Sequence, residues 1–155
     1  MGVKIIIRAL ESDLDKLKSP CSRLYLGGAY SNTKDKDDTW GRHNLILSQM
    51  SKMYCQVYSP IVHSHWADQL LGEENEKLYH FWLNHCLDML RFWATGMLVY
   101  KDPENNYLSS SGLHTELRTI SALNMPIGYL EMHKSNKNIL QWRGPGGKMW
   151  GELPC

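Results

Sequence analysis

The 155-residue chain lacks several features that would identify a partner or a compartment. Its net charge of +1 gives no case for a nucleic-acid backbone or an anionic membrane as the main partner. Its longest apolar stretches are too short to span a bilayer, and its first residues lack the small-residue cleavage site of a secretory signal. The four cysteines are widely spaced without a CxxC pair, so we predict free thiols and a cytoplasmic protein.

The chain also lacks the short motifs of several enzyme classes. Without GxGxxG or GxxxxGK[ST], neither a dinucleotide site nor a P-loop is supported, and no GxSxG elbow is present. His63 and His65 form an H-x-H pair that could bind a metal, but no paired cysteine or carboxylate is spaced to complete the ligand set. We therefore predict no metal and no cofactor, and assign these histidines to polar contacts with the edge of a ligand.

What the chain does have is a composition typical of one globular domain with a substantial core. It is 43% hydrophobic and 21% charged, and it contains six tryptophans and eight tyrosines, which is many for this length. Large aromatic side chains most often fill a core, but they also line pockets for flat ligands. The sequence leaves both roles open for each of these residues.

Alternating segments predict an α/β domain with a parallel sheet. We expect strands within 3–7, 23–31, 55–61, 94–101 and 126–132, helices at 39–54, 76–93 and 112–124, and loops at 62–75 and 102–111. Residues 1–22 are interpreted as an N-terminal extension with one weak strand, 23–132 as the domain, and 133–155 as a tail without clear periodicity. In such sheets ligands bind beyond the carboxyl ends of the strands. That rule directs attention to the loops 27–31, 60–66 and 102–112.

Two of these loops carry residues suited to holding a ligand. Gly27 and Gly28 follow a strand and allow the backbone to approach a ligand closely. Ser109–Gly112 opens a predicted helix, where unsatisfied N–H groups and serine hydroxyls could hold a phosphate. Ordinary N-capping by serine explains the same pattern and is favoured when this feature is taken alone.

Two carboxylates are candidates for catalysis. Glu116 lies in the early turns of its predicted helix, where the dipole favours the ionised form that attacks an electrophilic carbon. Asp88 shares a predicted helix face with Phe81, His85 and Phe92, where burial among aromatic rings would raise its pKa and suit it to donate a proton. Solvated positions on the helix surface are the alternative for both.

Four motifs in order resemble the nucleoside 2-deoxyribosyltransferase-like superfamily. They are "LYLGGAYS", "YSPIVHSH", "WLNHCLDML…TGMLVY" and "SSGLHTELRTISALNMPIGYL", and together they cover about residues 23 to 131. The likeness is greatest to a phage and bacterial branch of that superfamily. It implies a flavodoxin-like or Rossmann-like three-layer sandwich with a parallel sheet of about five strands. It also implies a homodimer or higher homo-oligomer.

The resemblance implies roles for particular residues. Glu116 matches the nucleophile that attacks the anomeric carbon of a nucleoside or nucleoside 5′-monophosphate, Asp88 the acid that contacts the base, and Tyr25 the tyrosine that positions the nucleophile. The matches in the substrate-binding part of the site are Gly27, Gly28 and Tyr30 around sugar and base, His63 and His65 at the base, and Ser110 and Gly112 at the start of the last helix.

Ser110 distinguishes two substrate classes within the resemblance. Transferases of free nucleosides tend to carry an acidic residue at this position, whereas the 5′-monophosphate N-hydrolases carry serine. A carboxylate would repel a phosphate, so Ser110 favours a nucleotide substrate, and Arg42 could add positive charge. The expected function is hydrolysis of a nucleoside 5′-monophosphate at its N-glycosidic bond. Base exchange between nucleosides and nucleotide binding without cleavage are the alternatives.

Overall fold

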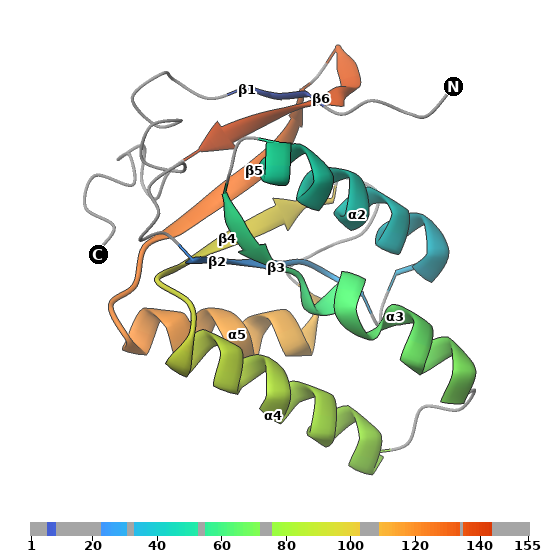
Figure 1. Ribbon diagram of the computed structural model, residues 1–155, viewed down its shortest axis with the longest axis vertical. Helices are drawn as coiled ribbons and strands as arrows, with labels where there is room; N and C mark the ends of the chain where they lie inside the picture. Colours follow the sequence, from blue (N-terminus) through green and yellow to red (C-terminus); the bar gives the residue numbers. More distant parts are fainter. Residues whose placement is uncertain are drawn as a thin grey trace.

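A six-stranded sheet organises the chain, which the computed structural model describes at residues 6–8, 23–30, 33–52, 55–71, 76–102, 109–133 and 135–143 (Figure 1). The strands are β1 (Ile6–Arg8), β2 (Arg23–Gly27), β3 (Gln56–Tyr58), β4 (Gly96–Lys101), β5 (Ile127–His133) and β6 (Asn136–Arg143). Their order across the sheet is β1-β6-β5-β4-β2-β3. The sheet contains a parallel part and a mixed edge.

The parallel part comprises β3, β2, β4 and β5, and it confirms the predicted α/β class. Tyr25 of β2 lies beside Tyr58 of β3 on one side and Met97 of β4 on the other. β6 pairs antiparallel with β5, and β1 pairs parallel with β6. The sheet is therefore mixed, although its parallel centre matches a flavodoxin-like arrangement.

Helices cover both faces of the sheet and complete three layers (Figure 1). They are α2 (Lys36–Lys52), α3 (Pro60–Leu71), α4 (Glu76–Phe92) and α5 (Ser111–Ala122). α2 lies on one face, while α4 and α5 lie together on the other (Figure 1). None of the helices in the described ranges combines the length and apolar character that a bilayer-spanning segment requires.

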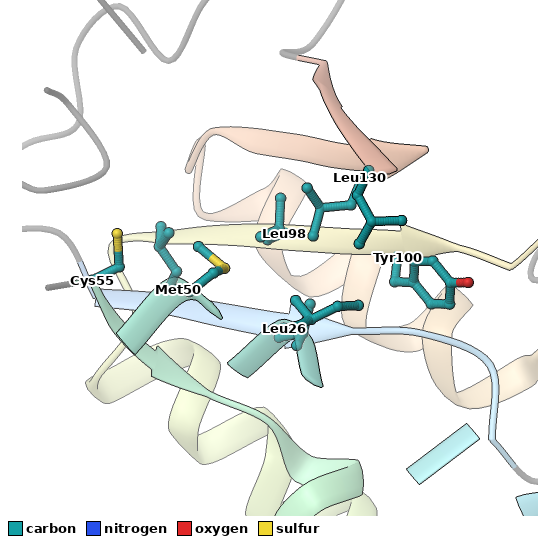
Figure 2. Packing of buried hydrophobic residues seen from close by; sticks show 9 residues of the cluster. Leu26, Met50, Cys55, Leu98, Tyr100 and Leu130 are labelled. Atoms are coloured by element: carbon teal, nitrogen blue, oxygen red, sulfur yellow. The ribbon is translucent and has the colours of Figure 1, made fainter. Parts of the chain in front are cut away.

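The alternation of side chains along the strands produces two separate cores, because neighbouring residues of a strand point to opposite faces. Leu24 and Leu26 of β2 face α2, whereas Tyr25 between them faces α4 and α5. On the α2 face, Leu26 and Leu98 pack with Met50 of the helix (Figure 2). The opposite core combines Met97 and Val99 of β4 with buried residues of α4 and α5.

One prediction about secondary structure is wrong. Residues 62–75 were expected to form a loop, but α3 occupies most of that range, beginning at Pro60 with Ser59 accepting a hydrogen bond from the Val62 N–H. In the tail, whose sequence has no clear periodicity, β6 joins the sheet. The weak strand expected near the N-terminus is confirmed as β1, which pairs with β6.

Candidate functional site

A cavity of about 140 Å³ lies beyond the carboxyl end of β2, between α3, α4 and α5. This is the edge where ligands bind in parallel α/β sheets. It is lined by Gly28, Tyr30, Pro60, Ile61, Ser64, Asp68, Leu78, Tyr79, Trp82, Leu83, Cys86, Ser110, Gly112, Leu113 and Glu116. Most of this lining is apolar or aromatic, and its two carboxylates are Asp68 and Glu116.

Glu116 is held in the cavity by Tyr25, as the sequence predicts. The Tyr25 hydroxyl donates a hydrogen bond of 2.6 Å to Oε1 of Glu116, from a fully buried position on β2. The other oxygen, Oε2, lies near Gly27, where an added Cβ would come within 3.4 Å of it and within 2.4 Å of Met97 Cε. A side chain at position 27 would therefore require the end of Met97 to shift and would lie against Glu116.

Burial adjusts the protonation of Glu116. Its side chain is only 7% exposed, and this burial raises its pKa to about 7, while the hydrogen bond from Tyr25 acts in the opposite direction. At neutral pH the carboxyl group is thus divided between its charged and neutral forms. A carboxylate stripped of water and held by one oxygen presents its second oxygen as a nucleophile or base.

The prediction that Asp88 lies in a desolvated aromatic environment is wrong. Asp88 is exposed on α4, and its expected neighbours Phe81 and Phe92 are themselves 61% and 83% exposed. The face of α4 that turns to the cavity instead carries Tyr79, Trp82 and Cys86, which recur at the spacing of helical turns. Asp88 is absent from the described lining, so it does not join Glu116.

Cys86 of α4, one of the four widely spaced cysteines, brings a thiol to the cavity. It is buried beside Tyr25 and Glu116, and burial together with the charge of Glu116 raises its pKa to about 12. A thiol with so high a pKa stays neutral at physiological pH and is a poor nucleophile. It contributes a small, uncharged wall beside the carboxylate.

The start of α5 brings Ser110 and Gly112 to the cavity. Ser110 is the N-cap of the helix, and its Oγ accepts a hydrogen bond of 3.4 Å from the Leu113 N–H. This confirms the capping role that the sequence also allowed. Because capping uses a lone pair of the hydroxyl oxygen, the hydroxyl hydrogen of Ser110 remains able to donate to a ligand.

The remaining predicted residues lie in different places. Gly28 and Tyr30 line the cavity. His63 and His65 are two residues apart on a helix and so point in different directions: His63 is exposed and stacks on His85, with ring centroids 5.5 Å apart, whereas His65 is fully buried. Neither histidine lines the cavity, and Arg42 of α2 does not line it either.

Several lining residues were missed because α3 was interpreted as a loop. Ser64 and Asp68 recur with Pro60 at intervals of four residues, which places them on one face of a helix. The Ser-Pro pair at positions 59 and 60 was the available signal, since serine at the N-cap followed by proline at the first position is typical of a helix start.

Neither a metal site among the described residues nor a match to a known protein helps to identify this cavity. No group of three or more histidine, cysteine, aspartate or glutamate side chains within the described ranges could hold a metal ion. Comparisons with models of known protein families, with curated proteins and with solved structures found no match. The function of the protein is therefore inferred from the geometry of the cavity and from the motifs in the sequence.

Proposed function

We propose that the protein hydrolyses the N-glycosidic bond of a nucleoside 5′-monophosphate, with Glu116 as the nucleophile. Oε2 of Glu116 attacks the anomeric carbon, the bond from that carbon to the base breaks, and its electron pair leaves with the base nitrogen, which takes up a proton. Water then attacks the same carbon and releases the sugar phosphate, returning the carboxylate of Glu116. The sequence motifs that resemble the deoxyribosyltransferase-like superfamily support this chemistry.

The observation that carries the proposal is the pair formed by Tyr25 and Glu116. A solvated helix-surface glutamate would need no buried partner, whereas this one is buried and fixed by a hydroxyl 2.6 Å from Oε1. Fixing one oxygen orients the other, which reduces the entropy lost on reaching the transition state. Tyr79 and Trp82 in the same cavity offer aromatic surface for a flat base.

The start of α5 supports a phosphate in the substrate. Ser110 offers a hydroxyl at a helix N-terminus, where the helix dipole favours anions. Among the described residues that line the cavity there is no lysine or arginine, so this helix end is the main favourable field for an anion. Free nucleosides are therefore the necessary comparison in any assay.

The test is release of free base from a panel of nucleosides and their 5′-monophosphates, measured by chromatography. We expect release from monophosphates, a rate that rises with pH through about 7 as Glu116 ionises, and a loss of at least about 1,000-fold in Glu116→Gln. Asp88→Asn is the matched control, because it removes a carboxylate that lies outside the cavity. Equal activity of Glu116→Gln and the native protein would contradict the proposal.

The same panel separates the alternatives. If a product forms only when a second base is supplied, the reaction is base exchange and not hydrolysis. Saturable binding of a nucleotide, with no free base after long incubation, would replace both reactions by a binding function.

A further inference from the structure

A chain of polar side chains runs from the surface of α2 to the cavity, through residues that the mechanism above does not use. Nε2 of His65 lies 3.0 Å from Oδ1 of Asp37, and Nδ1 of His65 lies 2.9 Å from the Tyr30 hydroxyl. The Tyr30 hydroxyl is in turn 3.2 Å from Oδ2 of Asp68. Tyr30 and Asp68 both line the cavity that contains Glu116.

His65, at the centre of this chain, is held rigidly. It is 0% exposed and stacks on Trp40, with ring centroids 5.4 Å apart and an angle of 16° between the planes. Its contact with Asp37 is close but not aligned as a hydrogen bond, so Asp37 acts on the ring through its charge.

The hydrogen bonds among His65, Tyr30 and Asp68 can form in two protonation states, which contain the same number of protons. In the first, His65 is charged and donates from Nδ1 to the Tyr30 oxygen, while the Tyr30 hydroxyl donates to the Asp68 carboxylate. In the second, the Asp68 carboxyl group is protonated and donates to Tyr30, which donates to a neutral His65. The two states interconvert when one proton moves along each link, without any movement of heavy atoms.

We propose that Asp68 donates a proton to the departing base and that His65, acting through the Tyr30 hydroxyl, supplies that proton to Asp68. This inference rests on the proposed glycosidase function and identifies the acid that the reaction requires. Asp68 is the catalytic residue of the set, because it faces the substrate cavity. Tyr30 and His65 act through it.

The protons balance over the reaction. When the carbon–nitrogen bond breaks, one proton leaves the chain. Nδ1 of His65 gives its proton to the Tyr30 oxygen, the Tyr30 hydroxyl proton passes to Asp68, and Asp68 delivers a proton to the base nitrogen, which leaves His65 neutral and Asp68 as a carboxylate. When water later attacks the sugar carbon, the bond to Glu116 breaks and its electron pair returns to the carboxylate. The proton lost by that water returns to the chain and restores its first state.

Lys36 lies at the Asp68 end of this chain. Its Nζ lies 3.6 Å from Oδ2 of Asp68 and 5.2 Å from the centre of the Tyr30 ring. The chain thus has a carboxylate, Asp37, beside His65 at one end and a lysine beside Asp68 at the other.

The test compares leaving groups, because a general acid matters only when the leaving group needs a proton. We would measure cleavage of a nucleoside 5′-monophosphate and of the matching sugar phosphate that carries 4-nitrophenolate in place of the base. For Tyr30→Phe, which removes only a hydroxyl, we expect a loss of about 100-fold on the nucleotide and less than about threefold on the nitrophenolate substrate. Asp68→Asn and His65→Asn should show the same selectivity.

Controls separate this inference from folding and from the proposed function. Tyr129→Phe removes a hydroxyl outside the cavity and should alter neither rate. If the buried His65→Asn does not fold by circular dichroism, Tyr30→Phe still decides the question. Equal losses on both substrates, or no loss on either, would overturn the proton chain while Glu116→Gln still reports the glycosidase. Failure of the native protein to cleave either substrate would overturn both.

Discussion

The same strands form an apolar core on one face of the sheet and support the cavity that holds Glu116 on the other. On the α2 face, Leu26, Leu98 and Leu130 pack against the helix, and the cluster is almost entirely apolar (Figure 2). On the α4 and α5 face, the strands present Tyr25, and the helices leave a cavity that contains a buried carboxyl group. The first face stabilises the fold, while the second gives up some packing to hold a polar group away from water.

His43 and Glu116 are buried ionisable side chains with shifted pKa values, and they differ in their partners. His43 on α2 is fully buried, neither of its ring nitrogens has a hydrogen-bond partner among the described residues, and burial lowers its pKa to about 4. Glu116 has Tyr25 as a partner, and its pKa is raised to about 7. Burial favours the neutral form of both. The charged form of Glu116 is supported by a hydrogen bond from Tyr25, whereas that of His43 is supported only by the charge of Asp102.

The largest effect is expected from a substitution on the apolar face alone, which should lower stability without changing activity. We expect Leu98→Ala, at a fully buried position, to lower the free energy of unfolding by about 3 kcal/mol, measured by urea denaturation. Base release per folded molecule should be unchanged, because the side chain lies on the face opposite the cavity. The exposed Leu123→Ala is the control and should change stability by less than about 0.5 kcal/mol. Loss of activity in folded Leu98→Ala would show that the faces are coupled.

Burial of the Glu116 carboxylate should lower the stability of the fold at high pH. Its folded pKa of about 7 lies above the ordinary value of 4.5, so the folded state binds more protons and stability falls as the pH rises between these values. Glu116→Gln should therefore be more stable than the native protein at pH 8, by up to about 3 kcal/mol, with little difference at pH 4. Thermal unfolding at both pH values measures this.

Burial of His43 should change stability with pH in the opposite direction. Its folded pKa of about 4 lies below the ordinary value of 6.5, so stability is lost as the pH falls between these values. Glu116→Gln should keep this loss on the acid side. A native protein with the same stability at pH 8 as its Glu116→Gln variant would contradict the view that the carboxyl group is desolvated.

The smallest effect is expected from Tyr25→Phe. This substitution removes the hydrogen-bond partner of Glu116 and so makes it resemble the unpartnered ring of His43. Loss of the hydroxyl removes the hydrogen bond that lowers the pKa of Glu116, so the pH of half-maximal base release should rise. The rate at pH 7 should fall about tenfold, equivalent to about 1.4 kcal/mol. An unchanged pH profile would show that the hydroxyl does not act on the carboxylate.

The sequence predicts the centre of the fold well because that part is regular. Alternation along β2 separates Leu24 from Tyr25, and the helical spacing of Tyr79, Trp82 and Cys86 marks the side of α4 that lines the cavity. The pairing of Tyr25 with Glu116 followed from the motifs, although 91 residues separate them. Periodicity and motif spacing can be recognised in a sequence without knowledge of its tertiary contacts.

The sequence fails where tertiary position decides the outcome. Asp88 lies on a helix face with aromatic rings, but nothing in the sequence shows that this face points to solvent. His65 was expected to contact a ligand directly, yet in α3 it lies on the side that packs against Trp40. β6 has no clear alternation, because its pairing with β5 and β1 is a property of the assembled sheet.

The pairing of β1 with β6 has a consequence for the order in which the chain folds. β1 is made first on the ribosome, but its strand partner is made after nearly all the other elements, so β1 must wait while β2 to β5 assemble. Contacts between such distant segments are slow to form, because a long loop must close before they contribute. The outer edge of β6 should therefore be open to other strands until β1 pairs with it.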